Sequence, residues 1–132
     1  MRSAIVVDAS AFAAVLFKEP EGEVLADSWA NSIIVAPSLL CYEIGNVALT
    51  KARRYPDIAD DCIEAYDIFL RLKIQFAKVG LREALAFAQR RNLTIYDASY
   101  AWLALSRGLD LISLDRRLIA AFEAEKSATH GR

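Results

Sequence analysis

Four acidic residues stand where a chemical site could be built: Asp8, Glu43, Asp97 and Asp115. Asp8 and Asp115 each follow a short apolar run, in "AIVVDASAF" and "LISLDRRL", and Asp97 stands inside "LTIYDASYAWLAL". Aspartate is a favoured N-cap residue and complements the helix dipole, so each of these three can also be explained as a helix cap. The sequence therefore leaves two alternatives open: separate caps, or one shared site.

Glu43 differs from the three aspartates because it falls inside an expected helix and cannot be a cap. Residues three and four positions away share its side of the helix, and these are Leu39, Leu40, Asn46 and Val47. A carboxylate beside an apolar stripe is costly to bury unless it is paired or bound to a cation. The alternative is an edge position from which the side chain reaches solvent.

The residue types that are missing narrow the chemistry further. The only histidine is His130, near the end of the chain, which argues against Ser-His-Asp and Cys-His triads and against a histidine-rich zinc site. The five glycines never cluster, so there is no P-loop and no dinucleotide fingerprint. If the chain is an enzyme, its carboxylates must carry the reaction. Oxygen ligands without His or Cys select Mg²⁺ or Mn²⁺, which suits phosphodiester cleavage.

The elements that must position these acids alternate along the chain. Hydrophobic periodicity predicts strands at 4–7, 33–36 and 109–113, with 74–79 as a third strand or an extended connection. Capping and breaking signals place helices at 10–17, 20–29, 37–53, 57–72, 81–91, 97–107 and 116–125. Asp57 is expected to cap the fourth helix and Asn92 to end the fifth, while the tail, 126–132, is expected to be frayed.

Alternating strands and helices predict an α/β fold with a central parallel sheet flanked by helices, a three-layer sandwich formed by a single domain of residues 1–132. Ligands of such sheets bind beyond the carboxyl ends of the strands. Asp8 and Asp115 follow two strands, and Asp97 is expected at the head of a helix after an extended "LTIY". All three are thus candidates for one rim of the sheet.

Composition limits the environment and the partners. The net charge of -1 does not indicate a general nucleic-acid binder, so a polyanionic substrate must be held by local basic groups or metal ions. Arg116, directly after Asp115, is the best-placed phosphate contact. Cys41 and Cys62 are expected to be buried, reduced thiols. No signal peptide or membrane span is recognisable, which predicts a soluble cytoplasmic protein. For Tyr96, core packing is favoured over stacking on a base.

The quoted motifs, together with "APSLLCYEIGNVAL", resemble in order and spacing the four acidic motifs of PIN-domain ribonucleases, and most closely VapC-type toxins. The resemblance extends over residues 5–118. It implies a hydrolase, an endoribonuclease in which Asp8, Glu43, Asp97 and Asp115 hold Mg²⁺ or Mn²⁺. It also implies an RNA substrate, a cognate antitoxin protein and a homodimer. The supporting residues that match the family are Ser10, Asn46 and Ser113, the last standing where the family more often has threonine.

Two rival functions remain for the same sequence. The first is a PIN-like interaction domain that has lost its metal, although all four acids are present. The second is a receiver-like phosphoacceptor domain, which needs an acidic pair at the first strand end and a lysine after a late strand. Here the first strand ends in "VVDAS", with one acid, and the last ends in "LISLDRR", without lysine.

Overall fold

The computed structural model describes residues 2–130 and contains a four-stranded parallel sheet. Its strands are β1 (Ala4–Val7), β2 (Ile33–Ala36), β3 (Gln75–Phe76) and β4 (Asp110–Ile112), in the order β3-β2-β1-β4. In the centre, Val6 pairs with Val35 on one side and with Leu111 on the other. The expected strands are confirmed, and the segment at 74–79 forms only a two-residue edge strand.

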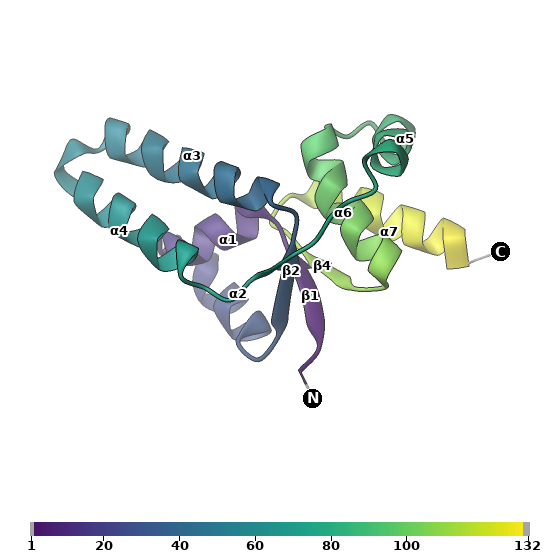
Figure 1. Cartoon of the computed structure of the whole chain (residues 1–132), viewed down its shortest axis with the longest axis horizontal. Helices are drawn as coiled ribbons and strands as arrows, with labels where there is room; N and C mark the ends of the chain where they lie inside the picture. Colours follow the sequence, from purple (N-terminus) through teal and green to yellow (C-terminus); the bar gives the residue numbers. More distant parts are fainter. Residues whose placement is uncertain (1, 131–132) are drawn as a thin grey trace.

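Helices cover both faces of the sheet, which confirms the three-layer α/β sandwich. In Figure 1, α1–α4 lie on one side of the strands and α5–α7 on the other, with α3 and α4 forming a long antiparallel pair. The helices are α1 (Ala9–Leu16), α2 (Gly22–Trp29), α3 (Leu39–Arg54), α4 (Ala59–Leu70), α5 (Leu81–Arg91), α6 (Ile95–Arg107) and α7 (Arg116–His130), with a short 3₁₀ turn at Pro56–Ile58.

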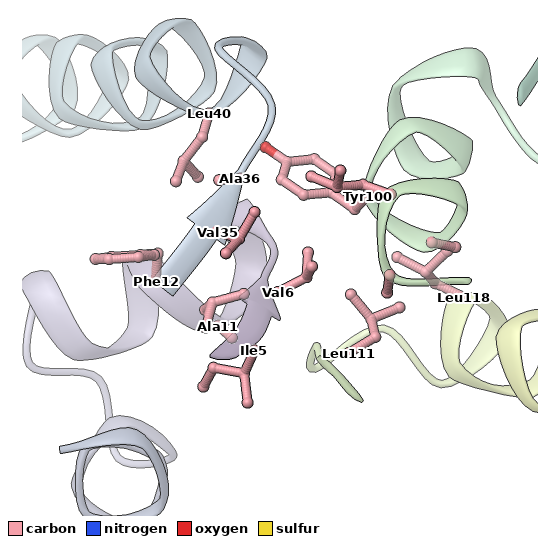
Figure 2. Packing of buried hydrophobic residues seen from close by; sticks show 14 of the residues in the cluster. Ile5, Val6, Ala11, Phe12, Val35, Ala36, Leu40, Tyr100, Leu111 and Leu118 are labelled. Carbon is pink, nitrogen blue, oxygen red and sulfur yellow. The ribbon is translucent and has the colours of Figure 1, made fainter. Parts of the chain in front are cut away.

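The core explains why the two central strands read as continuous apolar runs. Val6, Val7 and Val35 are almost fully buried, as expected for parallel strands with helices on both faces. Phe12 of α1 packs edge-on against Phe69 of α4, with ring centroids 5.4 Å apart. Figure 2 shows side chains from both helical layers meeting at these strands. The packing fixes where the strands end, and therefore where the residues after them stand.

The start of α6 corrects one expectation. "LTIY" is not extended throughout, because Ile95 and Tyr96 already belong to the helix. Thr94 is the N-cap, and its hydroxyl oxygen accepts a hydrogen bond from the backbone N–H of Asp97 at 3.1 Å. Threonine is itself a good cap. Asp97 therefore lies in the first turn of α6 and is neither its cap nor the end of a strand.

Two further expectations are wrong. Asp57 does not cap α4: it lies within the 3₁₀ turn, and α4 begins at Ala59 without a side-chain cap. Pro56 fixes a helical φ and starts the turn one residue before Asp57, which takes Asp57 out of the extended conformation of an N-cap. Residues 126–130, expected to be frayed, continue α7 to His130, while residues 131 and 132 lie outside the described part.

Other local expectations hold. The helix at Leu81–Arg91 is confirmed, and Asn92 ends it in the left-handed conformation, with φ of 57°. Both cysteines are free thiols; Cys62 is buried as expected, whereas Cys41 is only half-buried and does not meet the expectation of burial. Within residues 2–130, no helix combines the length and apolar character needed to cross a membrane.

Glu125 joins two helices of the same layer. Its carboxylate, 14% exposed, accepts hydrogen bonds from Arg90 at 2.8 Å and Arg91 at 3.0 Å, which ties α7 to the end of α5. Partial burial raises the pKa of Glu125, but the two guanidinium groups outweigh this effect and leave the pKa below its ordinary value. A lowered folded-state pKa means that the ionised carboxylate stabilises the fold.

We expect Glu125→Gln to destabilise the protein in a pH-dependent manner. The contribution of Glu125 is present above the unfolded carboxylate pKa of about 4.3 and is lost as pH falls through the folded value. The free energy of unfolding in urea should drop by about 1 kcal/mol near neutral pH, a figure reduced for solvent screening of the half-exposed Arg90. As pH falls below the folded-state pKa of Glu125, the two proteins should converge. An equal difference at neutral and at acid pH would contradict this account.

Candidate functional site

Asp8 is a buried carboxylate, 4% exposed, directly after the central strand β1. It is the N-cap of α1, and its Oδ1 accepts hydrogen bonds from the backbone N–H of Ala11 at 3.0 Å and the Ser10 hydroxyl at 2.7 Å. Its Oδ2 accepts a hydrogen bond from the Ser113 hydroxyl at 2.5 Å. The cap expectation for Asp8 is thus confirmed, but the cap accounts for only one of the three bonds.

Asp115 is tied to the same network from the other side. The Ser113 hydroxyl oxygen accepts a hydrogen bond from the backbone N–H of Asp115 at 2.9 Å, while donating its own hydrogen to Asp8. The Asp115 Oδ1 accepts from the backbone N–H groups of Arg117 and Leu118, at 3.0 and 3.3 Å, as a cap of α7 does. Ser113 therefore links the segments that follow β1 and β4 at the carboxyl edge of the sheet.

Glu43 comes from α3, in the opposite helical layer from α6. It is half-buried, and its Oε1 accepts a hydrogen bond from the hydroxyl of Tyr100 of α6 at 2.5 Å. In the described part of the chain, no lysine or arginine forms a salt bridge with Glu43, nor with the three aspartates of the set. Among residues 2–130, the charge of the four acids is therefore not neutralised by salt bridges.

The carboxylates influence one another electrostatically. Burial is the main cause that raises the pKa of Asp8, and the charge of Asp115 adds to it, against the opposing effect of the hydrogen bonds to Asp8. Burial likewise raises the pKa of Glu43, helped by Asp97 and Asp8, and that of Asp97, helped by Asp115 and Asp8. Each of the four sequence-predicted acids therefore affects, or is affected by, the charge of at least one other member of the set.

Donor type and charge at this edge fit a hard divalent cation. All four groups offer oxygen, the ligand that Mg²⁺ and Mn²⁺ prefer, and a cation would offset both burial and repulsion of the carboxylates. The carboxylates are spaced too widely to form a complete metal site as they stand. Among residues 2–130, no three His, Cys, Asp or Glu side chains lie close enough to hold one ion. The chemistry of the donors is present, and the close convergence of three ligands is not.

Comparisons with known proteins place this geometry in a family. The profile of the PIN domain matches residues 5–123, which takes in all four acids. The chain belongs to the PIN-domain family. It is 36% identical over 126 residues to a protein named Ribonuclease VapC3 from Pyrobaculum aerophilum, covering 91% of this chain and 95% of the relative. A protein named Exonuclease VapC9 from the same organism is 55% identical over 40 residues, 30% of each chain.

A solved structure supports the same assignment. The crystal structure of PAE2754 from Pyrobaculum aerophilum superimposes with a TM-score of 0.72 at 29% sequence identity, and the match covers 100% of both chains. The expected resemblance to VapC-type PIN domains is therefore confirmed, and so is the PIN-like sandwich.

One residue beside the acids of this PIN domain differs from expectation. Tyr96 is 57% exposed, so the preference for core packing is wrong; it lies one turn before Tyr100 on α6. Of the two arginines that follow Asp115, Arg117 is the one whose charge opposes the rise in the pKa of Asp97. Arg116, predicted as a phosphate contact, and Asn46 are exposed.

We expect Ser113→Ala to lower the free energy of unfolding by about 1–3 kcal/mol, because the buried Oδ2 of Asp8 loses its hydroxyl donor. Ser113→Thr keeps the hydroxyl and should remain close to the wild type. Ser106→Ala is a matched control, since the Ser106 hydroxyl donates only within α6, and it should change stability by less than about 0.5 kcal/mol. Urea unfolding at neutral pH measures all three, and equal stability of Ser113→Ala and Ser106→Ala would refute the role of Ser113.

Proposed function

We propose that this PIN domain is a Mg²⁺- or Mn²⁺-dependent endoribonuclease and the toxin of a toxin–antitoxin pair. The observation that carries the proposal is the group of four carboxylates, which repel one another at the carboxyl edge of the sheet without a neutralising ion pair among the described residues. Similarity over nearly the whole chain to a protein named Ribonuclease VapC3 supports the reaction class.

Asp8, Glu43, Asp97 and Asp115 would hold the divalent ion. When bound, such an ion makes hydroxide available at neutral pH and neutralises charge on the scissile phosphate. The Ser10 and Ser113 hydroxyls orient Asp8, and Ser113 also fixes the backbone of Asp115. Asn46, one turn after Glu43 on α3, is proposed as a polar neighbour of the site on the basis of the family resemblance.

The RNA backbone would be held by local positive charge, because the chain as a whole carries a net charge of only -1. Arg116 and Arg117 open α7 directly after Asp115, and both are exposed. Basic side chains of this kind bind phosphate oxygens and set the register of the substrate without reading its sequence. The proposed substrate is therefore RNA aligned across the start of α7.

The name of the relative also supports the proposed partners. VapC3 carries the name of a toxin class, and on that ground we propose a cognate antitoxin protein, a homodimer and action in the cytoplasm. Light scattering of the purified chain, alone and with the product of a neighbouring reading frame, would measure both assemblies.

We expect purified protein to cleave RNA with Mg²⁺ or Mn²⁺ and to stop when the ion is chelated. Asp8→Asn and Asp97→Asn should each lower the rate by at least about a hundredfold, since both remove charge where the reaction needs it. Asp110→Asn is the control, because Asp110 is 81% exposed and outside the set. Cleavage of circular RNA would separate an endonuclease from an exonuclease, the activity in the name of VapC9.

Two results would contradict this mechanism. Cleavage that survives exhaustive chelation, in a preparation free of other nucleases, would exclude the metal. An inactive wild type that also gives no heat on titration with Mn²⁺ would favour the non-catalytic PIN-like domain.

Expression of the chain without its antitoxin should arrest bacterial growth if cleavage is the basis of toxicity. Asp97→Asn should abolish the arrest at equal protein level, whereas Asp110→Asn should retain it. Colony counts after induction, with immunoblots for protein level, measure both. Equal arrest by the wild type and Asp97→Asn would disconnect toxicity from the acidic site.

A further inference from the structure

Tyr100 links the two helical layers through a hydrogen bond between α6 and α3. It belongs to α6, is 1% exposed, and donates its hydroxyl hydrogen to Glu43 Oε1 of α3 at 2.5 Å. Figure 2 shows the ring extending from α6 across the sheet, with its oxygen pointing toward the segment that joins β2 to α3. The contact links residues 57 positions apart in the chain.

The hydrogen bond restricts a side chain that nothing else in the described part of the chain restrains by ion pairing. A glutamate has several rotatable bonds, and fixing them costs conformational entropy. Tyr100 engages one oxygen of Glu43 and leaves the other oxygen without that donor. The residue three positions earlier on the same helix is Asp97, so α6 carries one acid of the site and the hydroxyl that holds another.

An ordinary structural role for Tyr100 must be weighed against this reading, because buried tyrosines usually find a partner for their hydroxyl. Tyr66 is an example of this structural role in the same protein: its hydroxyl donates a hydrogen bond to the backbone carbonyl of Cys41, also on α3, at 2.7 Å. That carbonyl is fixed by the helix backbone, so the hydrogen bond from Tyr66 does not serve to orient a charged side chain. Tyr100 instead uses a half-buried carboxylate that repels Asp97 and Asp8.

We propose that Tyr100 is a positioning residue for the candidate metal site: its hydroxyl holds one oxygen of Glu43 in place, which leaves the other oxygen available to bind the ion. The inference rests on the proposed function, because it assigns Tyr100 a role in ion binding and not only in packing. Because Tyr100 is only 1% exposed, we assign its effect to Glu43 and not to direct contact with RNA.

Titration with Mn²⁺, followed by calorimetry and by the electron paramagnetic resonance signal of free Mn²⁺, tests the role without any RNA. We expect Tyr100→Phe to weaken Mn²⁺ binding about tenfold, the usual cost of losing a group that orients a metal ligand. Tyr66→Phe is the matched control, because it removes a tyrosine hydroxyl that also donates to α3, and it should bind Mn²⁺ as the wild type does. All variants are compared at a temperature below the unfolding transition of each.

A second variant separates positioning from stability. In the Glu43→Gln background, Tyr100→Phe should cost little further Mn²⁺ affinity, because the ligand through which it acts has already been changed. A full tenfold loss in that background would overturn the inference, as would wild-type affinity in Tyr100→Phe alone. A wild type that binds no Mn²⁺ and cleaves no RNA would overturn the proposed function and this inference together. A wild type that binds Mn²⁺, beside an unaffected Tyr100→Phe, would overturn the inference alone.

Discussion

The burial of Asp8 between two helical layers organises the carboxyl edge of the sheet. A carboxylate with 4% exposure requires donors for its oxygens. Two segments supply them: the first turn of α1, through the Ala11 N–H and the Ser10 hydroxyl, and the segment after β4, through the Ser113 hydroxyl. Meeting this requirement brings the segment after β4 against the segment after β1. Asp115 follows Ser113 by two residues, so satisfying the first aspartate also places the last one.

Cap and site turn out to be compatible roles for the same side chains. Asp8 and Asp115 both accept hydrogen bonds from helix N–H groups, and Asp8 and Asp97 each repel other acids of the set. A helix start favours negative charge through its dipole, which partly offsets the cost of gathering acids there. The helix dipoles offset only part of the repulsion among the acids, and a divalent ion would offset the rest. This balance supports the proposal of a cation at this edge of the sheet.

The sequence predicted the parts of the structure that local physics controls. Apolar runs located β1 and β2, and Asn92 marked the end of α5, because strand burial and the left-handed turn leave direct traces in residue type. The positions of Asp8 and Asp115 after apolar runs pointed to the candidate site, because ligands of parallel sheets bind beyond the carboxyl ends of the strands. The exact start of α6 was missed because Thr94 and Asp97 both suit a cap, and only packing decides between them. The bond between Tyr100 and Glu43 joins distant helices, and no local pattern encodes it.

The central claim is that Asp8, Glu43, Asp97 and Asp115 form one metal site. The most direct measurement is a crystal structure of the protein with Mn²⁺, in which anomalous scattering locates the ion without assumptions about its ligands. The account predicts a Mn²⁺ peak at the carboxyl edge of the sheet, within coordination distance of oxygens from Asp8 and at least two of the other three acids. A fully occupied Mn²⁺ site elsewhere, with Asp8 and Asp115 bound only to their helix N–H groups and serines, would contradict it.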